Sequence, residues 1–322
     1  MHSFPVEHGE TLLEGALRTG ISLEYNCNNG RCGKCQARLI SGEIGNISPS
    51  DFVFTQIQKS QNYILLCRCK PISNLVIETN ELDADTDIRQ QTITTRVYKI
   101  NRIGDNFIVL QLRTPRNQTL QFLAGQHVSL NIKGLALRNK SIASCPCNGM
   151  YLEFHFRRKN MDPFSQYIFE SIKNKDTVMV TGPYGKFHLN EDSNHSAVFI
   201  AYETGFSSVK SLIEHAIARE QEKIIYLYWL VGNNGLHYLE NYCRAWVDVE
   251  DDFYYMPLTI DGSTQDTKDK LHYIINSTPA LSDCDIYICA PDHIVQPALD
   301  MFEQNNINSL QIYIDKMKRY NN

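Results

Sequence analysis

The sequence has no excess of positive charge and no long hydrophobic run. Its 31 lysine and arginine residues are outnumbered by 36 aspartate and glutamate residues, and the formal net charge is −5. A nucleic-acid-binding surface needs clustered lysine and arginine, so we expect no nucleic-acid partner. No apolar segment approaches the roughly 20 residues that a membrane-spanning helix requires, so we expect no membrane span.

A secretory signal is also missing from the first residues, MHSFPVEHGE, which lack a basic stretch followed by an apolar one. We therefore expect a cytoplasmic protein. The ten cysteines of such a chain are better explained as ligands or buried thiols than as disulfides. Five of them are expected to be structural, namely Cys69, Cys145, Cys147, Cys243 and Cys284.

Three regions with different hydrophobic patterns follow one another, so we expect three domains although length alone suggests about two. The first region contains one helical segment, which begins with Thr11 and Glu14 in capping-box spacing. Residues 92–190 contain six segments that mostly alternate apolar and polar residues, which is typical of antiparallel strands in a small barrel. After about residue 193, strands alternate with helices, which indicates a parallel sheet with helices on its faces.

The clearest boundary is the polar and acidic stretch DADTDIRQQ, residues 83–91, which is expected to be a linker. The domains are accordingly placed at residues 1–82, 92–192 and 193–322.

The strongest motif is Cys27-x4-Cys32-x2-Cys35 followed much later by Cys67, which is the plant-type spacing of a [2Fe–2S] centre. Three thiolates close in sequence must surround the cluster from one loop, and glycines between them allow the tight turns that this loop needs. The alternatives are core cysteines or a zinc site. Zinc sites prefer paired C-x2-C motifs, and only one occurs here, so the cluster is favoured.

The segment EYNCNNGRCGKCQARLISGEI, residues 24–44, resembles the ferredoxin module of bacterial NADH-dependent iron–sulfur flavoprotein reductases. This family includes the reductase components of phenol hydroxylase and methane monooxygenase and the CDP-6-deoxyhexulose dehydrase reductase. The resemblance extends over the whole chain. It implies an α+β and α/β multidomain protein with a β-grasp [2Fe–2S] ferredoxin domain, an antiparallel flavin-binding β-barrel and a Rossmann-like nucleotide domain. Most of the first strand of such modules is absent, so either the sheet lacks an edge or the chain starts at an internal Met.

In the middle region the resemblance places the flavin signature Arg-x-Tyr-Ser on Arg138, Lys140 and Ser141. It implies that Arg138 contacts the pyrophosphate of FAD and that Ser141 hydrogen-bonds the flavin N5. Lys140 replaces the stacking tyrosine. In a second flavin element the family's Gly-x-x-Ser is matched by Asp162 and Ser165, so the serine is kept and the glycine is not.

In the last region the family's Gly-Gly-Thr-Gly loop is matched by Tyr202, Glu203, Thr204 and Gly205. Thr204 and Gly205 are expected to bind the nicotinamide nucleotide, whereas the first two residues replace glycines that leave room for its pyrophosphate. The family's Cys-Gly-Pro is matched by Cys289-Ala290-Pro291, and the cysteine is expected beside the nicotinamide.

After the next strand the family's Gly-x-Arg is matched by Gly232-Asn233-Asn234. No arginine is therefore available for a 2′-phosphate, and NADH is favoured over NADPH.

The resemblance implies an electron-transfer reductase that passes electrons from NADH through FAD and a [2Fe–2S] cluster to an acceptor protein, such as an oxygenase or a dehydrase. A transient docking face suits this role. Two alternatives stay open. The chain could be a ferredoxin-like carrier or assembly subunit with degenerate cofactor sites, or a flavoprotein supplied by a donor other than NADH.

Overall fold

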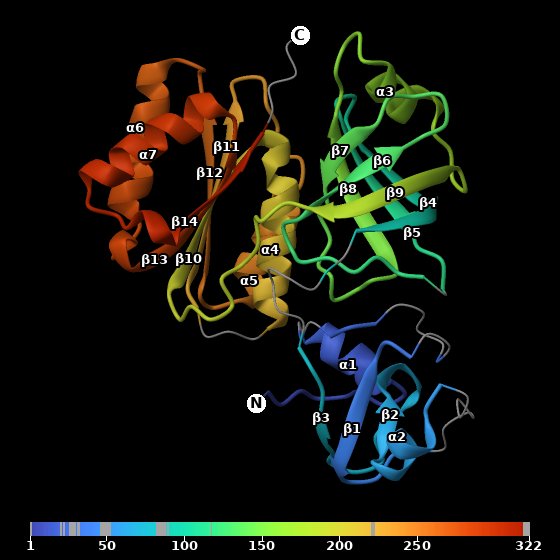
Figure 1. The fold of residues 1–322 in the computed structure, drawn as a ribbon. Coiled ribbons are helices and arrows are strands. Elements are labelled where there is room, and N and C mark those ends of the chain that lie inside the picture. The colour runs from blue at the N-terminus through green and yellow to red at the C-terminus, as the bar shows by residue number, and fades with distance from the viewer. Residues whose placement is uncertain are drawn as a thin grey trace.

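The structure, a computed structural model, describes residues 2–19, 21, 23–25, 30, 33–45, 53–81, 88, 90–116, 118–219 and 223–317. These residues form three sheets, one after another along the chain (Figure 1). The predicted linker falls mostly outside the described residues.

The first sheet has three strands in the order β2-β1-β3, and both pairs are antiparallel. Helix α1 begins at the predicted capping box, because the Thr11 hydroxyl accepts a hydrogen bond from the Glu14 amide and the Glu14 carboxylate accepts one from the Thr11 amide. Sequence patterns missed α2 and β2. The elements of this domain are α1 (Leu12–Arg18), β1 (Gln36–Ser41), α2 (Gln56–Ser60), β2 (Tyr63–Leu65), a 3-10 turn (Leu66–Arg68) and β3 (Val76–Glu78).

The second sheet is a six-stranded antiparallel barrel in the order β7-β6-β9-β4-β5-β8, as the alternating pattern predicts. The segment after β7 approaches β8, where the Ala143 amide donates to the Glu153 carbonyl at 2.8 Å and brings the two edges together. Its elements are β4 (Gln91–Ile103), β5 (Phe107–Arg113), β6 (His127–Asn131), β7 (Arg138–Ser141), β8 (Tyr151–Arg157), α3 (Pro163–Gln166), a π-helical turn (Tyr167–Ser171) and β9 (Thr177–Tyr184).

The third sheet is parallel, with the strand order β12-β11-β10-β13-β14. Sequence patterns predicted β10, β11, β13 and the helices that follow them, and they missed β12, α6 and β14. The elements are β10 (Ser196–Tyr202), a 3-10 turn (Glu203–Gly205), α4 (Phe206–Ala218), β11 (Ile225–Gly232), α5 (Glu240–Val249), β12 (Phe253–Ile260), α6 (Thr264–Ser277), a 3-10 turn (Leu281–Asp283), β13 (Cys284–Ala290), α7 (Asp292–Gln304), a 3-10 turn (Ser309–Gln311) and β14 (Ile312–Lys316).

Helices α4 and α5 lie between the parallel sheet and the barrel, whereas α6 and α7 cover the other face of the sheet (Figure 1). Phe206 of α4 stacks on Trp229 of β11 with ring centroids 3.9 Å apart. The same hydrophobic core includes Phe107 and Val109 of the barrel strand β5. Since one core spans both parts, the barrel and the parallel sheet are packed together through α4.

Cys145 and Cys147 form a disulfide, so the expectation of ligands or buried thiols rather than disulfides is wrong for this pair. They lie two residues apart, and their Cα atoms are 5.1 Å apart, which places both sulfurs on one side of the loop. Cys69, Cys243 and Cys284 are free and buried.

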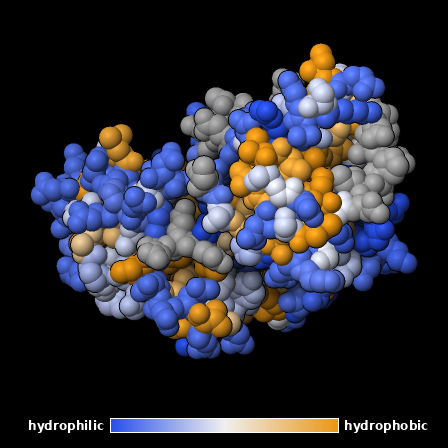
Figure 2. All heavy atoms as spheres, turned by 90° about the horizontal axis from the view of Figure 1, so that it is seen from below, coloured by the Kyte–Doolittle hydropathy of each residue, from blue (hydrophilic) through white to orange (hydrophobic). Residues whose placement is uncertain are grey.

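Among the helices in the described ranges, none has the length and apolar character needed to cross a membrane. Figure 2 looks onto the end of the molecule that carries the first sheet, where hydrophobic and polar surface are mixed. Where the structure describes this domain, its exposed large hydrophobic side chains are Ile40, Ile57, Ile72 and Val76.

Candidate functional site

The predicted cluster loop is described in part. Cys27 and Cys32 lie outside the described residues, whereas Cys35 and Cys67 are both buried and face each other. A hydrogen bond with Cys67 lowers the pKa of the Cys35 thiol to about 7. The Leu66 amide donates to the Cys35 carbonyl at 2.9 Å, which joins the two segments that carry these ligands. Two of the four predicted thiolates are thus brought together, as a shared cluster requires.

Two glycines of this loop have backbone conformations that other residues rarely adopt. Gly30 has a φ of +80° and Gly33 a φ of +72°. A Cβ atom at Gly30 would lie 2.8 Å from the Arg68 side chain, and one at Gly33 would lie 2.7 Å from Val53. The loop therefore needs glycine for conformation and for space, which fits a loop folded closely around a cluster.

Cys69 lies two residues beyond Cys67 and is fully buried. Burial raises the pKa of its thiol to about 11, and its carbonyl accepts a hydrogen bond from the Leu12 amide at 2.8 Å. A protonated thiol in the core suits the structural role that the sequence predicts.

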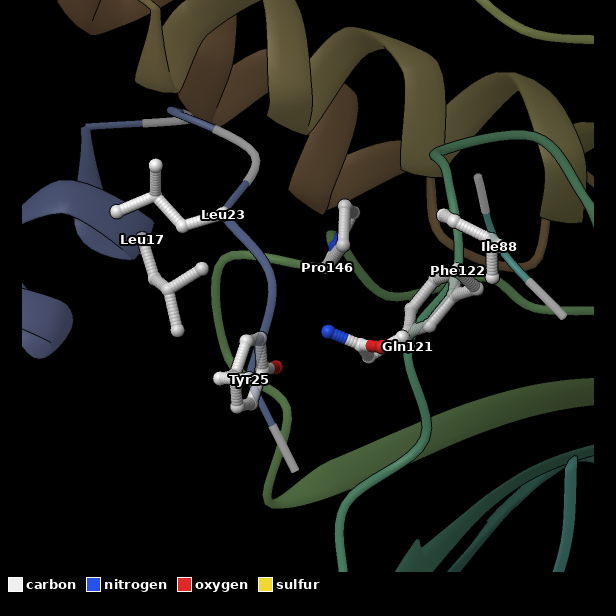
Figure 3. Close-up of a pocket in the computed structure, with 7 residues that line it drawn as sticks. All are labelled: Leu17, Leu23, Tyr25, Ile88, Gln121, Phe122 and Pro146. Atoms are coloured by element: carbon white, nitrogen blue, oxygen red, sulfur yellow. The ribbon is translucent and has the colours of Figure 1, made fainter. Parts of the chain in front are cut away.

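Tyr25, two residues before Cys27, joins the first domain to the barrel (Figure 3). Its ring is buried, and burial raises the pKa of its hydroxyl to about 12, while a hydrogen bond with Thr119 opposes this. A Cβ atom at Gly149 would lie 2.3 Å from the Tyr25 hydroxyl oxygen, so only glycine allows this approach. The loop that begins the cluster motif is therefore anchored on the flavin barrel.

The predicted flavin residue Arg138 lies on β7 and pairs with Asp162, with Nη2 and Oδ1 2.6 Å apart. Asp162 also caps α3, because its side chain accepts from the Phe164 amide. Asp162 stands at the position of the family's glycine. Its carboxylate is paired with Arg138, the residue that the resemblance assigns to the pyrophosphate.

Two further cations lie near this pair, and together with Arg138 they leave a net positive charge around Asp162. Burial lowers the pKa of Lys140 to about 8, and the charges of Lys159 and Arg138 add to this effect. The Lys140 ammonium lies 4.7 Å from the centroid of the Phe156 ring. Three cations around one carboxylate fit an anionic pyrophosphate.

Ser165 is buried on α3, and its hydroxyl accepts a hydrogen bond from the Lys159 amide at 2.8 Å. Ser141 ends β7 and is paired in register with His127 of β6. His127 also lies near Asp315 of β14, where its charge opposes the burial that raises the pKa of the Asp315 carboxyl.

The predicted nucleotide loop contains a second acid paired with an arginine. The Glu203 carboxylate forms an ion pair with Arg157 of β8, and the Glu203 carbonyl accepts from the Trp229 indole at 3.1 Å. Glu203 has a φ of +47°, a conformation that glycine adopts more easily. The ring of Tyr202 packs edge-on against the ring of His293, with ring centroids 5.9 Å apart.

Thr204 and Gly205 complete the 3-10 turn before α4. A Cβ atom at Gly205 would lie 2.4 Å from the Cys289 carbonyl oxygen, so this glycine is needed for the close approach of the loop to β13. Pro291 follows β13 and caps α7. The loop and the end of β13 therefore meet at the carboxyl edge of the sheet, where nucleotides bind in such folds.

Cys289 is buried at the end of β13 and has two polar neighbours that sequence reasoning missed. The Ser208 hydroxyl lies 3.2 Å from its sulfur, and an Asp315 oxygen lies 3.7 Å away. Burial raises the pKa of the Cys289 thiol well above its usual range and also raises the pKa of the Asp315 carboxyl. The cysteine is thus a protonated thiol beside a carboxyl group.

Arg157 and Asp315 were also missed, although each had a weak signal. Arg157 ends an alternating strand, and Asp315 follows the apolar segment IYI. Neither signal identified a partner, since the contacts of both residues come from distant segments.

Two family models match parts of the chain. Residues 1–71 match the family model of the 2Fe-2S iron-sulfur cluster binding domain, and residues 94–189 match that of the oxidoreductase FAD-binding domain. The chain is 29% identical over 315 residues to the CDP-6-deoxy-L-threo-D-glycero-4-hexulose-3-dehydrase reductase of Yersinia pestis. The aligned residues cover 97% of this chain and 94% of that protein. It is 31% identical over 229 residues to the phenol hydroxylase P5 protein of Acinetobacter pittii, with coverages of 69% and 64%.

Among solved structures, the Amycolatopsis cytochrome P450 reductase GcoB has a TM-score of 0.62 at 23% identity, with 97% of this chain and 96% of that chain covered. The ferredoxin reductase in carbazole 1,9a-dioxygenase has a TM-score of 0.60 at 22% identity, with coverages of 96% and 93%. These matches confirm the predicted fold class.

Proposed function

Because the chain belongs to the iron–sulfur flavoprotein reductases, we propose that it passes electrons from NADH to a partner oxygenase or dehydrase component. Bound FAD and a [2Fe–2S] cluster would supply the redox chemistry, in which a two-electron donor serves a one-electron centre. The observation that carries the proposal is the union in one chain of a cluster module and a flavin barrel, joined by Tyr25 next to the cluster loop.

The residues of this chain have separate tasks in the proposal. Arg138 and Ser165 would hold the pyrophosphate of FAD, and Lys140 would cover one face of its ring. Ser141 would offer a hydrogen bond at the flavin N5. The net positive charge around Asp162 supports this assignment.

On the nucleotide side, Thr204 and Gly205 would meet the pyrophosphate of NADH, and Cys289 and Pro291 would lie beside the nicotinamide. The support is the meeting of this loop with the end of β13, where Gly205 and Cys289 are in close contact. The four cluster ligands would be Cys27, Cys32, Cys35 and Cys67. Their support is the contact between the last two, together with the two glycine turns beside them.

The partner would dock transiently, as suits an electron-transfer encounter. The relatives' names suggest its kind, since one is a dehydrase reductase and another is a phenol hydroxylase protein. We further propose a cytoplasmic location. Apart from the two proposed cluster ligands, four cysteines among the described residues are free thiols, which suits a reducing compartment: Cys69, Cys243, Cys284 and Cys289.

A kinetic experiment tests the donor. The purified protein, loaded with FAD and cluster, is given NADH or NADPH with cytochrome c as the one-electron acceptor. We expect NADH to be preferred by at least about tenfold in kcat/KM, because Gly232 is followed by two asparagines and no arginine. Equal use of NADPH would contradict the donor assignment, and no rate with either would contradict the reductase.

A second function is favoured by the two acid–arginine pairs. In each pair a carboxylate binds an arginine that would otherwise be available to a phosphate; the pairs are Arg138–Asp162 and Arg157–Glu203. If these pairs exclude the cofactors, the chain is a ferredoxin-like carrier or takes its electrons from another donor. In that case the cluster is reduced by dithionite and never by NADH.

A further inference from the structure

A cluster of two cysteines and one histidine lies apart from the predicted cofactor residues. Cys145 and Cys147 occupy the loop after β7, and His215 lies on α4. The Nδ1 atom of His215 is 3.7 Å from the Cys145 sulfur and 3.8 Å from the Cys147 sulfur. Cys145 and His215 are buried, at 8% and 3% exposure. We propose that these three side chains bind a zinc ion, or a similarly soft metal ion, when the two cysteines are reduced.

The spacing of the three ligand atoms supports the proposal. Zinc–sulfur bonds of about 2.3 Å and zinc–nitrogen bonds of about 2.0 Å give a sulfur–nitrogen edge of about 3.6 Å in a tetrahedral site. Both observed sulfur–nitrogen distances are close to this value. The two sulfurs must also separate to about 3.8 Å, which requires reduction of the disulfide and a change of side-chain rotamer.

The chemistry of opening the site balances with a thiol reductant. Two thiols of a reductant such as glutathione give two electrons and two protons to the disulfide, which yields two cysteine thiols and one oxidised reductant. Zinc then replaces the two thiol protons, which pass to solvent. The disulfide and the metal-bound dithiolate are thus alternative states of the same pair.

The surroundings of His215 prepare its Nδ1 atom to be a ligand. Its other ring nitrogen, Nε2, lies 3.0 Å from a Glu191 carboxylate oxygen, and Glu191 is itself held by Arg219 at 3.2 Å. A hydrogen bond from Nε2 to a carboxylate fixes the proton there and leaves the lone pair on Nδ1, which is the arrangement around histidines that ligate metals. The ring therefore directs its free lone pair at the two sulfurs.

The loop that carries the cysteines is held against α4 by its backbone. The Cys145 amide donates to a Glu214 oxygen at 3.1 Å, and the Ser211 hydroxyl donates to the Ser144 carbonyl at 2.8 Å. An open cavity of about 600 Å³ adjoins the site and is lined by Cys145, Cys147 and Glu214 among others. The backbone of the loop is therefore held beside His215, and a water molecule has room to complete the tetrahedron.

The site also lies where three parts of the molecule meet. Pro146, between the two cysteines, lines a small pocket with Leu23 and Tyr25 of the first domain (Figure 3). His215 belongs to α4 of the parallel-sheet domain, whereas the cysteines follow β7 of the barrel. A bound ion would therefore join the barrel to α4 beside the contact with the cluster module.

The experiment measures zinc and iron in the same sample. The full protein is purified with its cluster and FAD, reduced anaerobically with glutathione, incubated with Zn²⁺ and passed over a desalting column. Zinc and iron are then counted by mass spectrometry, and the zinc ligands are identified by X-ray absorption at the zinc edge. Cys147→Ser and His215→Gln remove ligands, and Cys243→Ser is the matched control at a buried free cysteine on α5.

We expect about one zinc per chain in the wild type and in Cys243→Ser, with about two sulfur ligands near 2.3 Å. Cys147→Ser and His215→Gln should lose at least about tenfold in zinc affinity while keeping their iron. Equal zinc in all four proteins, or no zinc in the reduced wild type, would overturn the proposal.

Should a ligand variant lose its cluster or fail to fold, the wild type alone decides. Oxidised glutathione should then release the zinc and restore the disulfide, while the iron content stays constant. Zinc that remains bound to the oxidised protein would overturn the proposal equally.

Discussion

The first domain and the reductase half meet their cofactors in different ways. In the first domain the predicted ligands Cys35 and Cys67 face each other, and the glycines of the loop take the conformations that the fold requires. In the reductase half an acid stands at a family glycine in each proposed phosphate site, and each acid pairs with an arginine. On this assignment, a phosphate that enters either site would compete with a carboxylate for the arginine.

This difference shows that substitutions which look destructive in a sequence can be compensated in a structure. Asp162 and Glu203 are not isolated anions beside a phosphate site, because Arg138 and Arg157 neutralise them. Each acid has an arginine partner in the free protein, and we expect both acids to weaken the cofactor sites relative to sites with glycine.

The largest effect is expected in the first domain, from the loss of a predicted cluster ligand. Cys67→Ser should remove the cluster, so that iron falls from about two atoms per chain to near none. Cytochrome c reduction should be lost, whereas ferricyanide reduction by NADH should stay within about twofold because the flavin site is untouched. Iron analysis and the two assays measure this.

Cys69→Ser is the matched control, since Cys69 is a buried cysteine two residues away. It should keep its iron and both activities. A cluster that survives Cys67→Ser but not Cys69→Ser would show that the ligand set is wrong.

The next largest effect is expected in the nucleotide loop. Replacement of Tyr202 and Glu203 by glycine should lower the KM for NADH about tenfold, which corresponds to about 1.4 kcal/mol. The change removes the carboxylate that pairs with Arg157. It also places glycine, which adopts a positive φ without strain, at residue 203. KM is measured with ferricyanide as the acceptor.

The single variant Glu203→Gln distinguishes the effect of the negative charge from the effect of side-chain size. It removes the charge and keeps the size, so it should give part of the decrease in the KM for NADH. An unchanged KM in both variants would mean that these side chains do not obstruct the nucleotide.

A smaller effect is expected at the flavin site, where Lys140 and Lys159 already offset the charge of Asp162. Asp162→Asn keeps an oxygen to cap α3 but releases the charge on Arg138, so FAD should bind about fivefold more tightly. Quenching of FAD fluorescence measures this. Arg138→Gln, the opposite control, should weaken binding, and tighter binding in this control would contradict the assigned role.

The smallest effect concerns Lys140, and it depends on pH. Because the pKa of Lys140 is lowered to about 8, the folded FAD-free chain binds fewer protons than the unfolded chain between pH 8 and about 10.4. Stability from this group therefore rises with pH across that window. Lys140→Met should be more stable than the wild type below pH 8, and the difference should shrink toward pH 10.

Urea midpoints across this range measure the effect, and Lys99→Met is the control at an exposed lysine of β4. A stability difference for Lys140→Met that does not change with pH would contradict the burial of this charge.

Local signals in the sequence account for much of what could be predicted. The cluster motif and the Thr11 capping box depend on short spacings, and both were visible before the structure. The Arg157–Glu203 pair was not, because its partners are 46 residues apart and meet only when β8 packs beside the nucleotide loop. The pairing of Cys289 with Asp315 depends in the same way on the register of β13 and β14.

The missed elements have physical reasons as well. Strand β12 is an edge strand that contains Pro257, and its side chains are buried irregularly, so no clear alternation appears. Helix α6 buries only three of its 14 residues, namely Thr267, Leu271 and Ile274. The apolar stripe of this helix is therefore too narrow to stand out in the sequence.

The most direct test of the electron path is an anaerobic absorption spectrum of the purified protein during titration with NADH. The account predicts flavin and iron–sulfur bands that both bleach as NADH is added. An iron–sulfur spectrum without flavin, or flavin that NADH does not reduce, would contradict it and favour a carrier or a reductase supplied by another donor.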